Sequence, residues 1–118
     1  MPAIILNDLG TVTLSEDLIA IIAGTAAVEN YGIVAMNSKK AADAILQLVG
    51  SENMKRGVEA NILSDSATVD IDLHVTVMYG VSLPAVAQNA ISNVKYRVEE
   101  LTGLTVRNIN IYVESIRV

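Results

Sequence analysis

The single histidine, His74, marks the first place to look for chemistry. It follows Asp70 and Asp72 in a segment where polar and apolar residues alternate. On a β-strand, side chains two residues apart share a face and lie about 7 Å apart along the strand. Such a row could offer metal ligands, or a histidine whose charge responds to pH beside two carboxylates. Because these side chains project in parallel and do not converge on one ion, we expect a solvated sheet face and no metal site.

The other reactive residue types do not form a recognisable catalytic arrangement. General acid–base catalysis needs carboxyl groups in a cleft with pKa values pushed apart, whereas Glu16 with Asp17 and Glu99 with Glu100 are expected at exposed positions. No serine lies in a nucleophile elbow. The seven glycines are dispersed along the chain and do not form a phosphate-binding loop. The sequence therefore predicts a protein that is not an enzyme, with no catalytic residue and no cofactor.

Length and composition predict one domain with an excess of aliphatic residues. The chain has 118 residues, the usual size of a single domain, and we expect residues 1–118 to form it, with residues 1–9 as a loosely ordered N-terminal segment. Apolar residues make up 52% of the chain, yet its aromatic residues are all tyrosines, four in number. Such a surplus indicates either a dense core or a core plus an oligomer interface, and we expect a homo-oligomer.

The charge balance and the absence of cysteine exclude several classes of protein. The formal net charge is −5, and the lysines and arginines are scattered along the chain. Nucleic acids and anionic membrane surfaces select for a basic patch, so neither is an expected partner. A chain without cysteine fits a reducing cytoplasm. No signal peptide and no apolar run of membrane-spanning length is evident, so we expect a cytoplasmic protein without direct membrane insertion, held at a membrane only through a partner.

In the first half of the chain, the apolar pattern alternates between strand and helix. Residues 10–14 predict a strand, and Ser15 is a favourable cap for the helix that follows. Apolar residues cover more than half of this helix's circumference, and Gly24 within it suggests close packing against another backbone. Residues 33–36 predict a short strand, and residues 39–49 a second, one-sided helix.

The second half predicts a β-hairpin, a long helix and a last strand. The hairpin joins residues 58–62 to residues 69–79 through a turn at 64–66. The helix begins after Ser82 with Pro84 in its first turn and ends at Gly103. Its apolar stripe runs from Ala87 to Leu101. Strands with one apolar face predict an α+β two-layer sandwich, with a mixed or antiparallel sheet, helices packed on one face and the other face open.

The open face of this sheet is one candidate for the contact surface. It would carry the polar residues of the two longest strands, and the unused apolar surface around the first helix is the alternative. The candidate residues of the open face are Asp70, Asp72, His74, Asn108, Asn110 and Tyr112.

An ordered series of short motifs also runs through nearly the whole chain. The motifs are residues 10–15 (GTVTLS) leading into 19–24, residues 32–36 (GIVAM), 55–58 (KRGV), 69–73 (VDIDL), 79–82 (YGVS), and 101–106 (LTGLTV) leading into 109–111. Together they resemble the bacterial alkaline-shock-protein and Gls-type envelope stress response family, of which this chain would be a small single-domain member.

The resemblance implies a cytoplasmic protein of Gram-positive bacteria that has no known catalytic activity and is linked to cell-envelope or alkaline stress. Some members of the family are held at the membrane by a separate anchoring protein. Shorter members are often encoded beside a dihydroxyacetone-kinase-like, fatty-acid-kinase-type protein. We therefore expect a scaffold or adaptor that acts by self-association and protein–protein contacts. The alternative is a regulatory binding module for such a kinase-like partner.

Overall fold

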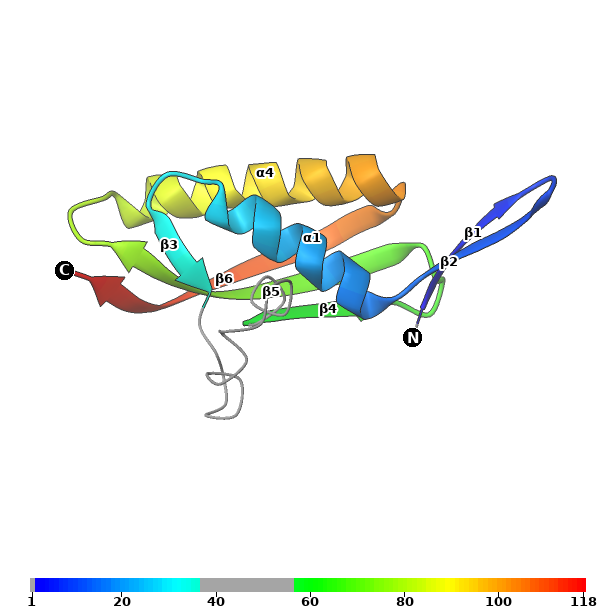
Figure 1. Cartoon of the computed structure of the whole chain (residues 1–118), viewed down its shortest axis with the longest axis horizontal. Helices are drawn as coiled ribbons and strands as arrows, with labels where there is room; N and C mark the ends of the chain where they lie inside the picture. Colours follow the sequence, from blue (N-terminus) through cyan, green and yellow to red (C-terminus); the bar gives the residue numbers. More distant parts are fainter. Residues whose placement is uncertain (1, 37–56) are drawn as a thin grey trace.

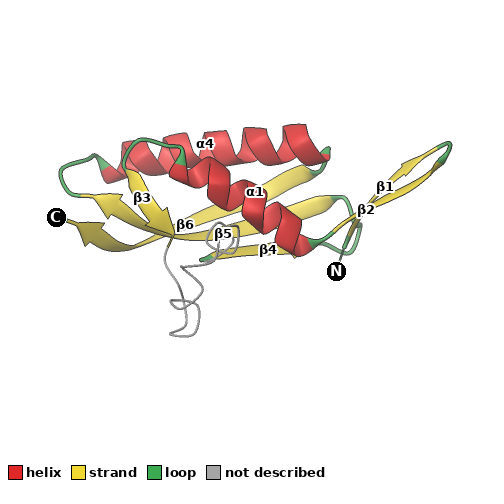
Figure 2. Ribbon diagram, in the orientation of Figure 1, coloured by secondary structure: helices red, strands yellow, loops and turns green. Residues whose placement is uncertain are grey.

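Two helices lie side by side on one face of a four-stranded sheet in the computed structural model, which describes residues 2–36 and 57–118 (Figure 1). A two-stranded hairpin extends from one end of this body. Figure 2 shows both helices on the same side of the strands, which leaves the other sheet face without a helix in the described part of the chain. This arrangement confirms the predicted α+β class. The helix predicted over residues 39–49 lies outside the described residues.

The sheet is built around β5, Thr68–Met78. Two short strands share one of its edges in antiparallel pairing: β4, Val58–Ile62, runs along residues 69–73, and β3, Ile33–Met36, runs along residues 75–77. The whole opposite edge of β5 pairs in parallel with β6, Thr105–Arg117. The sheet is therefore mixed, and the predicted hairpin of β4 and β5 is confirmed.

Apolar and polar residues alternate strictly along β5, which suits a strand at the centre of the sheet. Each of its apolar side chains that points toward the helices is fully buried: Val69, Ile71, Leu73, Val75 and Val77. The residues between them are polar and lie on the opposite face. A strand that is paired on both edges and buried on one face holds its side chains in fixed positions, so β5 sets the geometry of the polar face as well as that of the core.

The first helix, α1, spans Glu16–Val28 and is buried on more than one side, as predicted. Ser15 caps the N-terminus of this helix, because its Oγ accepts a hydrogen bond from Leu18 N at 3.1 Å. Buried small residues, Gly24 among them, form much of its surface. This allows a close approach to α4, Leu83–Thr102, where Asn93 Nδ2 donates to Ala26 O at 3.0 Å. Most of the apolar surface around this helix is therefore used within the fold.

The helix α4 connects the parallel strands β5 and β6. It buries a stripe of Val86, Ala90, Val94 and Val98, and it ends at Gly103 in a left-handed conformation, as predicted. The prediction was wrong for Leu101, whose side chain is 63% exposed.

Thr102 is buried in the last turn of α4 in place of Leu101. Its Oγ1 donates to Val98 O and accepts a hydrogen bond from Leu104 N. Internal hydrogen bonds thus make a polar residue compatible with burial at the position where the apolar stripe ends.

The projecting hairpin consists of β1, Ala3–Asn7, and β2, Gly10–Leu14. The sequence predicted β2 but left residues 1–9 as a loosely ordered segment, and residues 3–7 form a paired strand instead. Ala3 is fully buried, and Ile4 N donates to Ser66 O at 3.1 Å, which fixes the base of the hairpin to the body. Its tip points away from the helices and the main sheet (Figure 1).

Candidate interaction face

The sheet face turned away from the helices carries a ladder of polar pairs along β5 and β6. The parallel register places Asp70 beside Asn108, Asp72 beside Asn110, and His74 beside Tyr112. The residues predicted for this face are therefore all brought together, as direct cross-strand neighbours. We define the open face as these residues together with Thr76, Arg107, Glu114 and Ser115.

An ion pair between Asp70 and Arg107 lies at the end of the open face nearest the start of the two strands. Arg107 Nε donates to Asp70 Oδ1 at 3.1 Å, and Arg107 Nη2 donates to Oδ2 at 2.5 Å. These hydrogen bonds lower the pKa of the Asp70 carboxyl and raise the pKa of the guanidinium. A planar guanidinium matched to both carboxylate oxygens has a defined orientation, so the cationic end of the face is held in place.

Two further side-chain hydrogen bonds link β5 to β6 across the open face. Asn110 Nδ2 donates to Asp72 Oδ1 at 3.0 Å, and Thr76 Oγ1 lies 3.1 Å from Ser115 Oγ. Each bond joins β5 to β6 through side chains as well as through the backbone ladder. The polar face is therefore partly ordered before anything binds to it.

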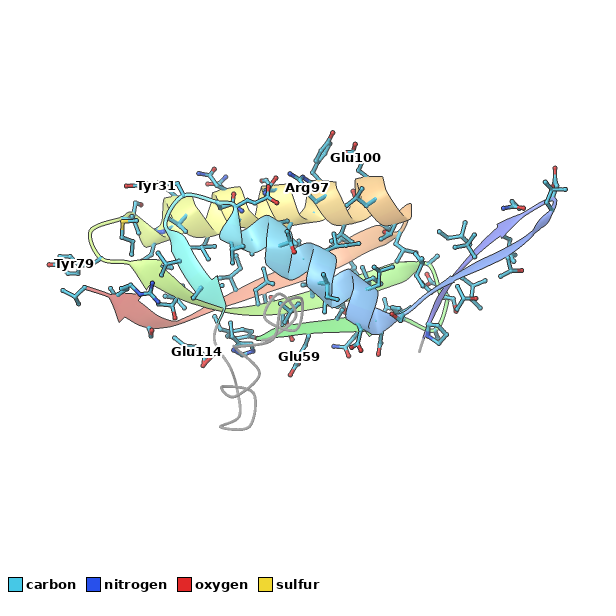
Figure 3. The ribbon with its side chains drawn as sticks, viewed as in Figure 1. Tyr31, Glu59, Tyr79, Arg97, Glu100 and Glu114 are labelled. Carbon is cyan, nitrogen blue, oxygen red and sulfur yellow. The ribbon has the colours of Figure 1, made fainter. Side chains whose placement is uncertain are left out.

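His74 occupies a defined position on the open face. Its Nδ1 forms a hydrogen-bonded pair with Glu114 Oε1, and its ring stacks on Tyr112 with centroids 4.8 Å apart and planes 16° apart. The imidazole is thereby largely covered, whereas the Tyr112 side chain stays 46% exposed. Figure 3 shows Glu114 and Glu59 on the side away from the helices, and the register of β4 places Glu59 beside Asp72.

Arg107 and Glu114 were not among the candidate contact residues of this face, and both enter it at β-bulges. The register skips one residue of β6 between Val106 and Asn108, and one between Val113 and Ser115. The skipped residues are Arg107 and Glu114. A bulge adds a residue to one strand and redirects its side chain. The sequence signal for each bulge was a pair of consecutive polar residues, Arg107–Asn108 and Glu114–Ser115. Strict alternation would have required one residue of each pair to be apolar.

The geometry favours recognition over chemistry. Within residues 2–36 and 57–118, no group of three or more histidine, cysteine or acidic side chains is arranged to hold a metal ion. Asp70, His74 and Glu114 each have a partner on the face. What the face offers is a row of oriented donors and acceptors beside an exposed tyrosine ring, and tyrosine and arginine are enriched where proteins contact one another.

Neither helix in the described part of the chain combines the length and the apolar character that a membrane span requires.

A comparison with known protein families decides the relationship that the motifs indicated. The profile of the alkaline shock protein 23 family, described as having a cell envelope-related function, matches residues 5–118. The chain belongs to this family. The match covers every element described above except the first residues of β1, which confirms the resemblance seen in the ordered motifs.

The chain is similar to curated bacterial proteins whose names describe them as uncharacterized. The chain is 39% identical over 110 residues to the uncharacterized protein YloU of Bacillus subtilis, covering 92% of this chain and 90% of YloU. It is 36% identical over 110 residues to the uncharacterized protein Spy1614 of Streptococcus pyogenes, covering 92% and 89%. The uncharacterized protein YqhY of Bacillus subtilis is 31% identical over 109 residues, with 92% and 78% covered. No solved structure matches the chain.

Proposed function

We propose that this protein is a non-catalytic scaffold or adaptor that acts in a cell envelope-related process by contacting other proteins through its open face. The observation that carries the proposal is the ordered polar ladder of β5 and β6, with Tyr112 and Arg107 exposed among paired carboxylates. The family description supports the cell-envelope setting.

The side chains of the open face are already held in place by one another, which favours binding because it lowers the entropy cost of association. Fixing a flexible side chain at an interface costs about 0.5–1.5 kcal/mol. Here Arg107 is already held by Asp70, and His74 by Glu114 and Tyr112. A partner therefore meets side chains that have lost much of their freedom on folding, and less of the contact energy is spent on ordering them.

The charge of the open face indicates the chemistry of the partner. The face carries the carboxylates of Asp70, Asp72 and Glu114 against the guanidinium of Arg107, and the whole chain has a net charge of −5. A partner surface rich in basic groups or hydrogen-bond donors complements this balance. Exposed charge pairs are screened by salt, so we expect the association to weaken as ionic strength rises.

The test is affinity capture of the tagged protein from its native host, with mass spectrometry of the recovered proteins. The variant D70A/D72A/H74A removes the β5 side of the ladder. The control variant K95A/E100A changes exposed charged residues of α4 on the helix layer, where Figure 3 shows Glu100 pointing away from the sheet. We expect the control to retain the partner and the triple variant to lose it.

Unchanged recovery with the triple variant would exclude the open face as the contact surface. Recovery of a membrane-anchoring protein or of large assemblies would support the scaffold. Stoichiometric recovery of one kinase-like enzyme would favour the regulatory module instead.

A further inference from the structure

The outer edge of β6 is an unpaired strand edge in the described part of the chain. Among the strands of residues 2–36 and 57–118, β5 alone pairs with β6, on one side. In β5, His74 of the open face and Met78, which follows it by four residues on the same side of the strand, donate their amides to Gly57 O and Gly32 O, on the edge away from β6. Because β6 runs parallel to β5, its open-face residues direct their amides toward β5. Its helix-face residues Ile109, Ile111 and Val113 therefore direct theirs to the free edge, where they can pair with another strand.

We propose that this edge binds the β6 strand of a second copy of the chain, in antiparallel pairing with a two-fold axis at Ile111. The two sheets would join into one continuous sheet, with the helices of both copies on the same side. The inference goes beyond the proposed function, since it names a second surface, through which the scaffold associates with itself.

The pattern of inward and outward side chains in β6 fits the antiparallel register centred on Ile111. The bulges at Arg107 and Glu114 make the sequence of inward and outward side chains symmetric about Ile111. Residues that face the helices therefore oppose residues that face the helices in the second copy. The opposed pairs are Val106 with Ile116, Ile109 with Val113, and Ile111 with itself.

Each of these pairs is formed by β-branched apolar residues, which are the favourable cross-strand neighbours in antiparallel sheets. A shift of one residue would place apolar side chains against polar ones, so the pattern selects a single register. Ile116 is 49% exposed and Val113 is 38% exposed in the single copy, and pairing would cover part of both.

Charge complementarity selects the same antiparallel arrangement. Around Ile111, Arg107 stands opposite Ser115 of the second copy and next to its Glu114, on the open face. The symmetry produces this meeting of opposite charges twice. A parallel pairing of the same two edges would require one copy to turn over, which would place the open faces on opposite sides of the sheet and separate these opposite charges.

The bulges also limit the extent of the contact. Charges and bulges at strand edges usually discourage open-ended pairing. In β6 they bracket the regular segment 108–113, which is long enough to form a ladder. Because a two-fold contact uses the same edge of both copies, it closes on itself, and association stops at a dimer.

The first experiment measures the oligomeric state of the pure protein by light scattering across a concentration series. The substitution I111P removes the central outward amide but no bond to β5, a position that tolerates proline in a folded edge strand. The matched control I111V keeps the amide and the β-branched side chain. We expect wild type and I111V to be dimeric and I111P to be monomeric, with circular dichroism confirming that each is folded.

A cross-linking variant tests the register even if I111P does not fold. The chain has no cysteine, so I111C introduces a single thiol. Opposed residues in a hydrogen-bonded antiparallel pair have Cα atoms about 5.5 Å apart, within the reach of a disulfide. We expect oxidation to produce a covalent dimer from I111C and none from the control N61C, an exposed position on β4.

A wild type that stays monomeric up to about 1 mM, the weak end of measurable association, would overturn the inference. A dimer that persists in I111P and that I111C fails to cross-link would also overturn it, because another surface would then be responsible.

These outcomes are separable from the proposed function. The variant D70A/D72A/H74A leaves the β6 edge intact, so the pure variant should remain dimeric. Loss of partner capture with an intact dimer removes only the open-face contact, and retained capture by a monomer removes only the edge pairing.

Discussion

Arg107 donates to both carboxylate oxygens of Asp70 across the β5–β6 pair, although the backbone register places Asn108 at that level. The ion pair exists because the first bulge of β6 inserts Arg107 as an additional residue directed to the open face. The charged ladder of that face is thus a product of irregular strand geometry. Glu114 reaches His74 through the second bulge in the same way.

Replacing Arg107 with alanine should raise the pKa of the Asp70 carboxyl toward its ordinary value, since the guanidinium hydrogen bonds are the main cause of its lowering. A carboxyl whose pKa is lowered by folding contributes stability above its unfolded pKa, and this stability is lost as pH falls through the folded pKa. The pair is exposed to solvent, so its contribution to stability should be small.

Carboxyl NMR titration of Asp70 and urea unfolding over a series of acidic pH values would check this prediction. The control R107K keeps the charge but loses the two-bond geometry, and it should give an intermediate pKa. An Asp70 pKa that does not move in R107A would show that the ion pair does not form in solution.

The substitution L73A should lower the free energy of unfolding by about 2–5 kcal/mol, the usual cost of a cavity in a packed core. Leu73 is fully buried at the centre of β5. The control L6A truncates the same residue type on the projecting hairpin, where the side chain is 76% exposed, and should change stability by less than about 0.5 kcal/mol. Urea unfolding of both variants measures the difference, and equal effects would contradict the assigned core.

Gly32 should not tolerate alanine, for two separable reasons. Its φ is +99°, and an added Cβ would lie 2.6 Å from Val86 Cγ2. Gly80 has a φ of +94° with no atom within 4 Å of such a Cβ, so G80A isolates the backbone strain, about 1 kcal/mol.

We therefore expect G32A to be more destabilising than G80A in thermal unfolding. In the double variant G32A/V86A, the cost of G32A measured relative to V86A should approach that of G80A, because the clash is removed. If G32A and G80A were equally destabilised, the contact with Val86 would have no energetic consequence.

The hydrogen bonds of the Thr102 hydroxyl lead us to expect different losses of stability from two small substitutions. Its buried hydroxyl joins Val98 O to Leu104 N at the start of the connection to β6. T102V keeps the shape but leaves the Leu104 amide without its acceptor, and it should cost about 1–3 kcal/mol. T102S keeps the hydroxyl and should cost less. Denaturant unfolding compares them, and a neutral T102V would mean that water replaces the hydroxyl.

Local sequence patterns predicted most of the individual elements in the described residues. The alternation of Val69 to Val77 defined β5 and its two faces, and Ser15 and Gly103 marked the ends of helices correctly. The prediction failed at residues 3–7, where consecutive apolar residues give no alternation, and at Leu101, where the last turn of α4 extends past the core. Both failures are places where a local pattern does not determine what packs against it.

By itself, the sequence determined the fold class and most members of the polar strand faces, because hydrophobic periodicity is a local property of the chain. Its ordered motifs indicated the family. Only the tertiary structure decided that β6 lies parallel to β5, so that Asp70, Asp72 and His74 stand beside Asn108, Asn110 and Tyr112. It also placed Arg107 and Glu114 on the open face through the bulges. Register and bulges depend on how distant strands pair, and that pairing is fixed by the packing of α4 and the core between them.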